Sequence, residues 1–378
     1  MKKYLVVALL VALVAGIASF TTTQPVEDSL SWNDSLRALY ARSISEWPQP
    51  TIDAGVNWKE LTALPVDTAI VAKLKDPKIN LGKLLFFDPR LSGSNQISCS
   101  SCHDPDLAWT DGRTVSLGND HRQGTRNTST ILNVAQVKEL FWDGRSASLE
   151  DQAINPMATI HEMNQEPPTI PDELSAIAGY PPLFEKVYGD KKINLDRILD
   201  ALAAFERSVA SRRSRFDEFM NGKYQRLNDE EIQGLHLFRT KARCMNCHNG
   251  TYFTDNQFHN IGLTYYGRKY EDLGRYNVTK EAGDVGKFRT PSLRDVMKTR
   301  PWMHNGLFDN IEGILNMYSA GMPQPKPKPD QVNDPLFPKT DPLIKKLDLT
   351  PEEKKALMAF LDAITGVPYK MDRPELPK

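Results

Sequence analysis

The four cysteines of this 378-residue chain form two pairs, and each pair has two residues between its cysteines and a histidine directly after it. The residues of the two motifs are Cys99, Cys102, His103, Cys244, Cys247 and His248. When a c-type haem is attached, two thiols add to the vinyl groups on one edge of the porphyrin, and the adjacent imidazole binds the iron. The spacing therefore predicts two covalently bound c-type haems.

Paired cysteines of this spacing also occur in zinc sites and in redox-active motifs. A zinc site usually keeps its two pairs within a few tens of residues, whereas Cys99 and Cys244 are 145 positions apart. Neither alternative requires a histidine after both pairs. Haem attachment is the favoured interpretation, and it uses every cysteine in the chain.

Helical patterns surround both motifs. Gly82–Phe86 and Gly234–Phe238 carry apolar residues at helical spacing shortly before the two motifs. A helix is predicted over Leu195–Val209, and a capping box at Thr350 with proline at the first helical position predicts another to about Ile364. Asn228 is the expected cap of the helix that leads into the second motif. Each motif is therefore expected to lie between two helices.

The segments after the two motifs also resemble each other. Arg126–Val134 is similar to Arg289–Val296, and Trp142–Gly144 is similar to His304–Gly306 at nearly the same distance onward. Strand-like alternation is scarce. The pattern predicts an all-α protein of two cytochrome c-like domains, each with one haem, and with the haems facing the domain interface.

Length and composition agree with a folded two-domain protein, since 40% of the residues are hydrophobic and 25% are charged. The 47 basic residues balance 48 acidic ones, so no basic field exists that would attract nucleic acid. The proline-rich stretch from Pro323 to Pro342 predicts an extended surface loop.

The N-terminus has the features of an export signal. Lys2 and Lys3 precede an apolar run from Tyr4 to Ile17, and small residues follow, with cleavage expected near Ala18. Residues 1–20 are therefore predicted to be a secretory signal that directs the protein to the periplasm. Without cleavage the same segment would act as a membrane tether.

The runs from Leu81 to Met163 and from Phe238 to Tyr318 resemble the bacterial di-haem cytochrome c peroxidase family, which includes the MauG-type enzymes. The resemblance covers nearly the whole mature chain. Besides the two haem motifs, the matching segments are Leu85–Gly93, Arg126–Asn127, Phe141–Arg145, Gln152, Glu162–Met163 and Trp302–Gly306.

The resemblance implies that hydrogen peroxide is reduced at the N-terminal haem and that electrons enter through the C-terminal haem. A small cytochrome c or a cupredoxin would supply them. The implied organisation is an N-terminal extension over residues 21–75, a peroxidatic haem domain over residues 76–222 and an electron-transfer haem domain over residues 223–378. The resemblance leaves open whether the chain forms a homodimer.

Three residues match the catalytic positions of the family. Glu162 matches the acid–base residue that moves a proton between the two peroxide oxygens, and Gln152 matches at the family's spacing. Trp142 matches the tryptophan that relays electrons between the haems. The resemblance also implies a calcium site made of Asn127 and the backbone carbonyls of Thr299 and Pro301, and oxygen ligands suit calcium.

The chain departs from the family's peroxidases at the first haem. A second histidine there occupies the open iron position in the oxidised enzyme and must leave on activation, but the matching residue here is Asn119. His121 lies two residues further on and could substitute only if the loop shifts. We therefore expect no block of the resting enzyme.

A second departure concerns the far ligand of the C-terminal haem. The peroxidases place methionine there, and the aligned residue is Tyr318, a phenolate donor that stabilises ferric iron. Met322, beyond Gly321, is the alternative ligand. His304 is expected to support the second haem, whereas His236 and His259 show no pattern that implies a role.

Three hypotheses follow. The leading one is a cytochrome c peroxidase, an oxidoreductase that uses peroxide as acceptor. The second is a MauG-like enzyme that oxidises residues of a partner protein, which Tyr318 and the missing histidine favour. The third is a non-enzymatic di-haem electron carrier, which would need neither an open haem nor Glu162.

Overall fold

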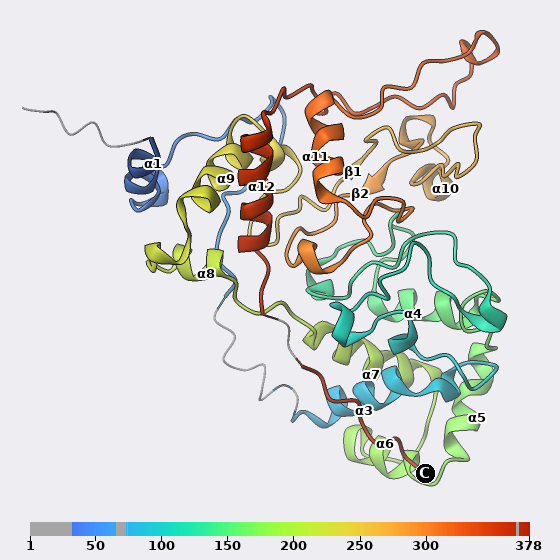
Figure 1. Cartoon of the computed structure of the whole chain (residues 1–378). Coiled ribbons are helices and arrows are strands. Elements are labelled where there is room, and N and C mark those ends of the chain that lie inside the picture. The colour runs from blue at the N-terminus through green and yellow to red at the C-terminus, as the bar shows by residue number, and fades with distance from the viewer. Residues whose placement is uncertain (1–31, 66–72, 74, 368–369) are drawn as a thin grey trace, which may run out of the picture.

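The computed structural model describes residues 32–65, 73, 75–367 and 370–378, so the predicted signal over residues 1–20 lies outside them. The described chain is mostly helical (Figure 1). No helix among these residues has the length and apolar character needed to cross a membrane. The helices are α1 (Trp32–Tyr40), α3 (Pro77–Phe87), α4 (Leu149–Ala158), α5 (Ile170–Ser175), α6 (Tyr180–Tyr188), α7 (Leu195–Ser208), α8 (Arg215–Met220), α9 (Asp229–Arg239), α10 (Tyr276–Thr279), α11 (Ile311–Ala320) and α12 (Pro351–Ala363).

The helices predicted around the haem motifs are confirmed. Thr350 begins α12 and Asn228 begins α9, each with a capping box to the glutamate three residues later. One feature differs from the all-α expectation. Strands β1 (Phe258–His259) and β2 (Phe288–Arg289) form a small antiparallel sheet, in which Phe258 pairs with Arg289.

The same helix crossing occurs twice. Helix α3 packs on α7, and α9 packs on α12 (Figure 1). A Cβ atom added at Gly82 would lie 1.9 Å from the carbonyl oxygen of Ala201, and one at Gly234 would lie 2.0 Å from that of Ala356. Each crossing therefore needs glycine, because any side chain would separate the two backbones.

Each crossing is filled by three aromatic rings in equivalent places. In the first, Phe86 packs on Phe205 and Trp109 at centroid distances of 5.2 and 5.9 Å. In the second, the corresponding rings are Phe238, Phe360 and Phe253, at distances between 5.3 and 6.1 Å. The sequence repeat thus corresponds to a repeated structural unit around each haem motif.

The two hydrophobic cores are not continuous in sequence. The core around α9 and α12 includes Leu36 and Tyr40 of α1, and also Phe216 of α8, which precedes the predicted boundary at residue 222. The core around α3 and α7 includes Met371 near the C-terminus. Each end of the described chain therefore closes the unit that is further from it in sequence.

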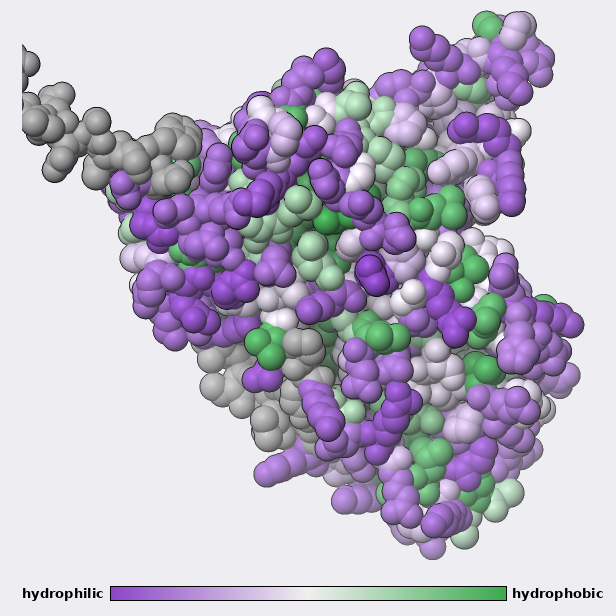
Figure 2. Space-filling view, in the orientation of Figure 1, coloured by the Kyte–Doolittle hydropathy of each residue, from purple (hydrophilic) through white to green (hydrophobic). Residues whose placement is uncertain are grey.

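The proline-rich segment projects from the molecule as an extended loop, as predicted, and carries only a short 3-10 turn over Pro329–Gln331 (Figure 1). Figure 2 shows a mainly hydrophilic surface on this projection. At its base, Tyr266 packs against Phe337 and donates a hydrogen bond of 2.5 Å to Asp334. The end of the loop that returns to the molecule is held by the hydrogen bond from the Asp341 N–H to the Asn260 carbonyl.

Candidate haem sites and the interface between them

The first haem motif forms a 3-10 turn, Cys99–Ser101, directly after the loop that follows α3. The Nδ1 atom of His103 lies 3.1 Å from the backbone carbonyl of Trp109, which leaves Nε2 as the nitrogen available to iron. Burial lowers the pKa of His103, so the ring is neutral. A neutral imidazole with a fixed orientation is the form that binds a metal.

The second motif repeats this geometry. Cys244–Asn246 forms a 3-10 turn, and His248 Nδ1 lies 3.0 Å from the Phe253 carbonyl. Burial also lowers the pKa of His248. All four cysteines are free, and burial raises the pKa of Cys102 to about 11 and that of Cys244 to about 12. Two free thiols and one oriented imidazole at each motif fit a covalently bound haem.

Glu162 lies next to the first motif. It follows α4, and its backbone carbonyl accepts a hydrogen bond of 2.7 Å from the Asn119 N–H. Burial raises the pKa of Glu162, and the charges of His161 and Arg145 only partly oppose this. Its charge also acts on the thiol of Cys102. The structure therefore brings together the first haem motif, Glu162 and position 119.

Asn119, which the resemblance matches to the family's blocking histidine, has a buried side chain that donates a hydrogen bond of 3.0 Å to Asp120. His121 lies in the same 3-10 turn and is exposed. Gln152 lies half-buried on α4, ten residues before Glu162.

Trp142 lies where the two repeats meet. Its indole donates a hydrogen bond of 2.9 Å to the Asn127 carbonyl, and the Asn127 N–H donates one of 2.8 Å to the His304 carbonyl. In return, the Arg289 N–H donates one of 2.9 Å to the Trp142 carbonyl. Asn127 and Trp142 of one repeat thus bond crosswise to His304 and Arg289 of the other.

This crosswise pairing joins equivalent positions. Trp142 corresponds to His304, since each lies nine residues after a left-handed residue, Asn133 or Asp295, that begins a 3-10 turn. Asn127 corresponds to Arg289, six residues before the same markers. The two repeats therefore face each other across a pseudo-twofold arrangement, and Trp142 is part of the contact.

Ion pairs strengthen the same interface. Arg126 is bonded at 2.6 Å to Asp143 of the first repeat and at 2.7 Å to Asp272 of the second. Arg275 of the second repeat donates hydrogen bonds to the carbonyls of Asp143 and Gly144 and makes an ion pair of 2.7 Å with Glu139. Partial burial makes such a network resistant to screening by salt.

Asn127, one residue of the expected calcium site, lies at this interface. Asn127 bonds to His304, and Thr299 and Pro301 lie in the loop just before it. The side-chain nitrogen of Asn127 donates a hydrogen bond of 2.9 Å to the Arg113 carbonyl, which leaves its oxygen free to act as a ligand. Pro301 lines a cavity of about 350 Å³ together with Thr114. The calcium site stays a prediction.

Tyr318 lies on α11 beside the second motif. Burial raises its pKa, and the charges of Cys247 and Cys244 raise it further, so the phenol is close to both cysteines. Helix α11 ends at Gly321, which is left-handed with φ of 93°, and Met322 follows as a buried residue outside the helix. Tyr318 stays the predicted far ligand, and Met322 stays the alternative.

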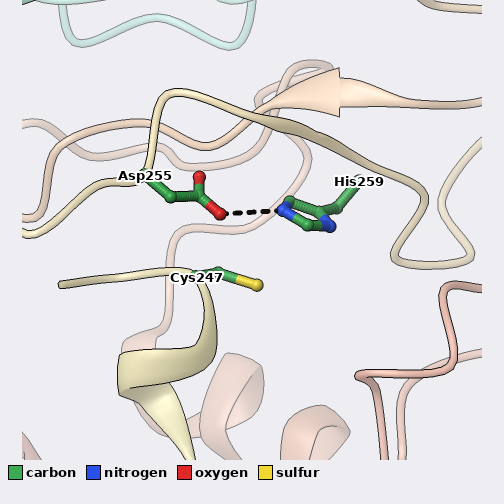
Figure 3. Close-up of side chains that lie close together, drawn as sticks. All are labelled: Cys247, Asp255 and His259. Carbon is green, nitrogen blue, oxygen red and sulfur yellow. Dashed lines mark hydrogen bonds and ion pairs between the residues drawn. The ribbon is translucent and has the colours of Figure 1, made fainter. Parts of the chain in front are cut away.

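His259 and His236, which showed no pattern in the sequence, both have defined partners. His259 lies 3.0 Å from Asp255 and 2.7 Å from Asp341, close to Cys247 (Figure 3). Burial opposes its charged form, but the two carboxylates prevail and raise the pKa of His259 to about 12. Because Cys247 is needed for haem attachment, we do not interpret Cys247, Asp255 and His259 as a metal site. We interpret the ion pairs of His259 as contacts that stabilise the second motif. His236 bonds to Tyr40 at 3.1 Å.

Comparisons with known proteins agree with this geometry. Residues 76–225 match the family described as di-haem cytochrome c peroxidase. The chain is 36% identical over 318 residues to methylamine utilization protein MauG of Methylophilus methylotrophus, covering 82% of this chain and 90% of the relative. It is 34% identical over 330 residues to cytochrome-c peroxidase IdrP1 of Pseudomonas sp. (strain SCT), covering 79% and 84%. A crystal structure of a MauG-like protein associated with microbial copper homeostasis has a TM-score of 0.70 and 31% identity, covering 84% of this chain and 96% of that one.

Proposed function

The chain belongs to the di-haem cytochrome c peroxidase family, which includes MauG, and we propose that it reduces hydrogen peroxide to water with electrons from a small cytochrome c or cupredoxin. The observation that carries this proposal is Glu162, a half-buried carboxyl with a raised pKa beside the first haem motif. An electron carrier would have no use for such a group. The similarity to cytochrome-c peroxidase IdrP1 supports the same activity.

Glu162 and Gln152 would serve the peroxide at the first haem. The haem, when bound, supplies an iron position at which the O–O bond of peroxide can be cleaved. Glu162 takes a proton from one peroxide oxygen and returns it to the other, so that one oxygen can leave as water. Gln152 would help to orient the peroxide from α4.

Trp142 would connect the two haems. Its indole and its backbone carbonyl are both hydrogen-bonded, to Asn127 and to Arg289, so the ring has a fixed orientation at the interface. A fixed aromatic ring between two redox centres suits electron relay.

We further propose that calcium binds Asn127 with the carbonyls of Thr299 and Pro301, and that the protein acts in the periplasm after export.

The test uses the protein with both haems attached, verified as two c-type haems per chain by the pyridine haemochrome assay. Reduced cytochrome c and reduced cupredoxin are offered separately, with and without peroxide. We expect peroxide-dependent oxidation of at least one donor. A protein that exchanges electrons with both donors, but at rates that peroxide does not change, would be an electron carrier and not a peroxidase.

A second candidate is MauG-like oxidation of a partner protein, and the position of Tyr318 beside the second motif favours it. The similarity to MauG of Methylophilus methylotrophus points the same way. Changing Tyr318 to Phe should alter the ferric spectrum of the second haem if the phenolate is its ligand, whereas changing Met322 to Leu should not. The reverse result, together with loss of a sulfur-to-iron charge-transfer band in the Met322 variant, would favour the peroxidase alone.

A further inference from the structure

Arg289 is a buried cation without a partner of its own. Its side chain is 7% exposed, and its Nε atom has no hydrogen-bond acceptor among the described residues. The guanidinium makes one long hydrogen bond of 3.4 Å, from Nη1 to the carbonyl of Thr290. The carboxylate whose charge acts on Arg289 is that of Glu139, and it is already paired with Arg275 at 2.7 Å.

Other buried arginines in the protein are paired. Arg294 lies 2.9 Å from Asp217, and Arg239 makes an ion pair with Glu60. An unpaired charge in a protein interior costs several kcal/mol, and this cost is visible in the pKa of Arg289, which burial lowers to about 10. The side chain therefore requires an anion that the described part of the chain does not provide.

The position of Arg289 indicates which anion it meets. Strand β2 ends at Arg289, and two residues later the backbone of Pro291 lies close to the ring of His248, the predicted iron ligand of the second motif. Thr254, six residues after His248, donates a hydrogen bond of 2.7 Å to the carbonyl of Thr290. Two residues span at most about 7 Å, so Arg289 lies at the edge of the second haem site.

A haem carries two propionate groups, whose carboxylates are the anions available at that edge. We propose that the Arg289 guanidinium binds a propionate of the second haem in a charge-assisted hydrogen bond. This inference rests on haem attachment and not on the proposed peroxidase reaction. The N–H of the same residue holds the carbonyl of Trp142, so Arg289 positions the haem and the relay residue together.

The proposed arginine contact distinguishes the second haem from the first. The position equivalent to Arg289 in the first repeat is Asn127, which is neutral. A buried positive charge near a haem favours its reduced form, because reduction lowers the charge on the iron. Arg289 therefore raises the reduction potential of the second haem and offsets part of the opposite effect expected from a tyrosinate ligand.

The experiment compares the holoprotein with the variants Arg289→Gln and Arg289→Lys. The reduction potential of the second haem is measured by an EPR-monitored redox titration, and the propionate bending modes by resonance Raman spectroscopy. Arg289→Gln should lower the equilibrium constant for reduction of the second haem about tenfold or more, which is 59 mV for a one-electron couple. It should also shift a propionate mode, and Arg289→Lys should restore much of the potential.

Lys287→Gln is the matched control, because it removes a cation two residues before Arg289 that is already paired with Asp284 at 3.0 Å. It should leave the propionate modes unchanged. An Arg289→Gln protein with both haems and with unchanged potential and propionate modes would overturn the proposal. If that variant does not fold, a crystal structure of the wild-type holoprotein decides. A propionate oxygen within hydrogen-bond distance of the guanidinium supports the proposal, and a guanidinium that meets only protein or water refutes it.

Discussion

At the scale of single residues, the account depends on Glu162. Changing Glu162 to Gln keeps the size and much of the hydrogen-bonding capacity of the side chain but removes its ability to take up a proton and return it. We expect the steady-state rate with peroxide to fall by about 10²–10⁴-fold, the usual contribution of general acid–base catalysis. Both haems should stay attached in the haemochrome assay. Near-normal turnover in this variant would mean that another group moves the proton.

The raised pKa of Glu162 gives a second prediction. Burial favours its protonated form, but the residue must be ionised to take the first proton from peroxide. The rate constant for the reaction with peroxide should therefore decline as the pH falls through a pKa above the normal range for glutamate. Rapid mixing over a series of pH values measures this. The decline should be absent in the Glu162→Gln variant, and its persistence there would assign the titration to a different residue.

The sequence identified the haem ligands from local spacing, because the attachment chemistry fixes the order of the residues. The sequence did not indicate that Arg289 and His259 are site residues. Each gains its meaning from partners far away in the chain, such as Trp142 and Asp341. A single sequence contains no periodicity that reports such contacts. Their only early signal was the resemblance of Arg289–Val296 to Arg126–Val134.

At the scale of elements, the crossing of α3 on α7 sets the position of the first motif. Gly82→Ala would place a Cβ atom 1.9 Å from the Ala201 carbonyl, so the helices must separate. We expect a loss of about 1–3 kcal/mol or more of stability, as for other overpacked sites, measured by denaturant unfolding of the holoprotein. Gly313→Ala on α11 is the control, since its Cβ would meet nothing closer than 3.9 Å.

That control should be neutral or stabilising by up to about 1 kcal/mol, because alanine is the better helix former. Equal effects of the two substitutions would show that the close crossing does not carry the stability assigned to it.

The helices themselves were predictable from apolar spacing and caps, whereas the small sheet of β1 and β2 was not. Its strands have two residues each, too short for any alternation to appear.

At the scale of the whole molecule, the C-terminal segment closes the unit that holds the first haem. Met371 is buried in that core, Arg90 donates a hydrogen bond of 2.9 Å to the Pro377 carbonyl, and the Gly179 N–H bonds to the Lys378 carbonyl at 2.8 Å. Deleting residues 370–378 should lower the thermal transition by several degrees, since each kcal/mol lost shifts Tm by about 2–4 °C in chains of 150–250 residues.

Arg373→Ala is the control for this deletion, because it removes only an exposed ion pair with Asp104. Exposed pairs contribute about 1 kcal/mol or less, so Tm should change little. A truncated protein with the same Tm as the wild type would show that the segment lies on the core without stabilising it.

The two-repeat organisation was predictable from sequence, but the exchange of terminal segments between the cores was not, since it depends on contacts between opposite ends of the chain.

The most direct test of the central claim is rapid mixing of the fully oxidised holoprotein with hydrogen peroxide, followed by reduced cytochrome c or reduced cupredoxin. The resemblance matches Asn119 to the family's blocking histidine, and the Asn119 N–H bonds to the Glu162 carbonyl. We expect an immediate change in the haem spectrum without prior reduction, and its reversal as at least one of the donors is oxidised. If no change occurred until one electron had been supplied, His121 or another residue would block the iron, contrary to this account.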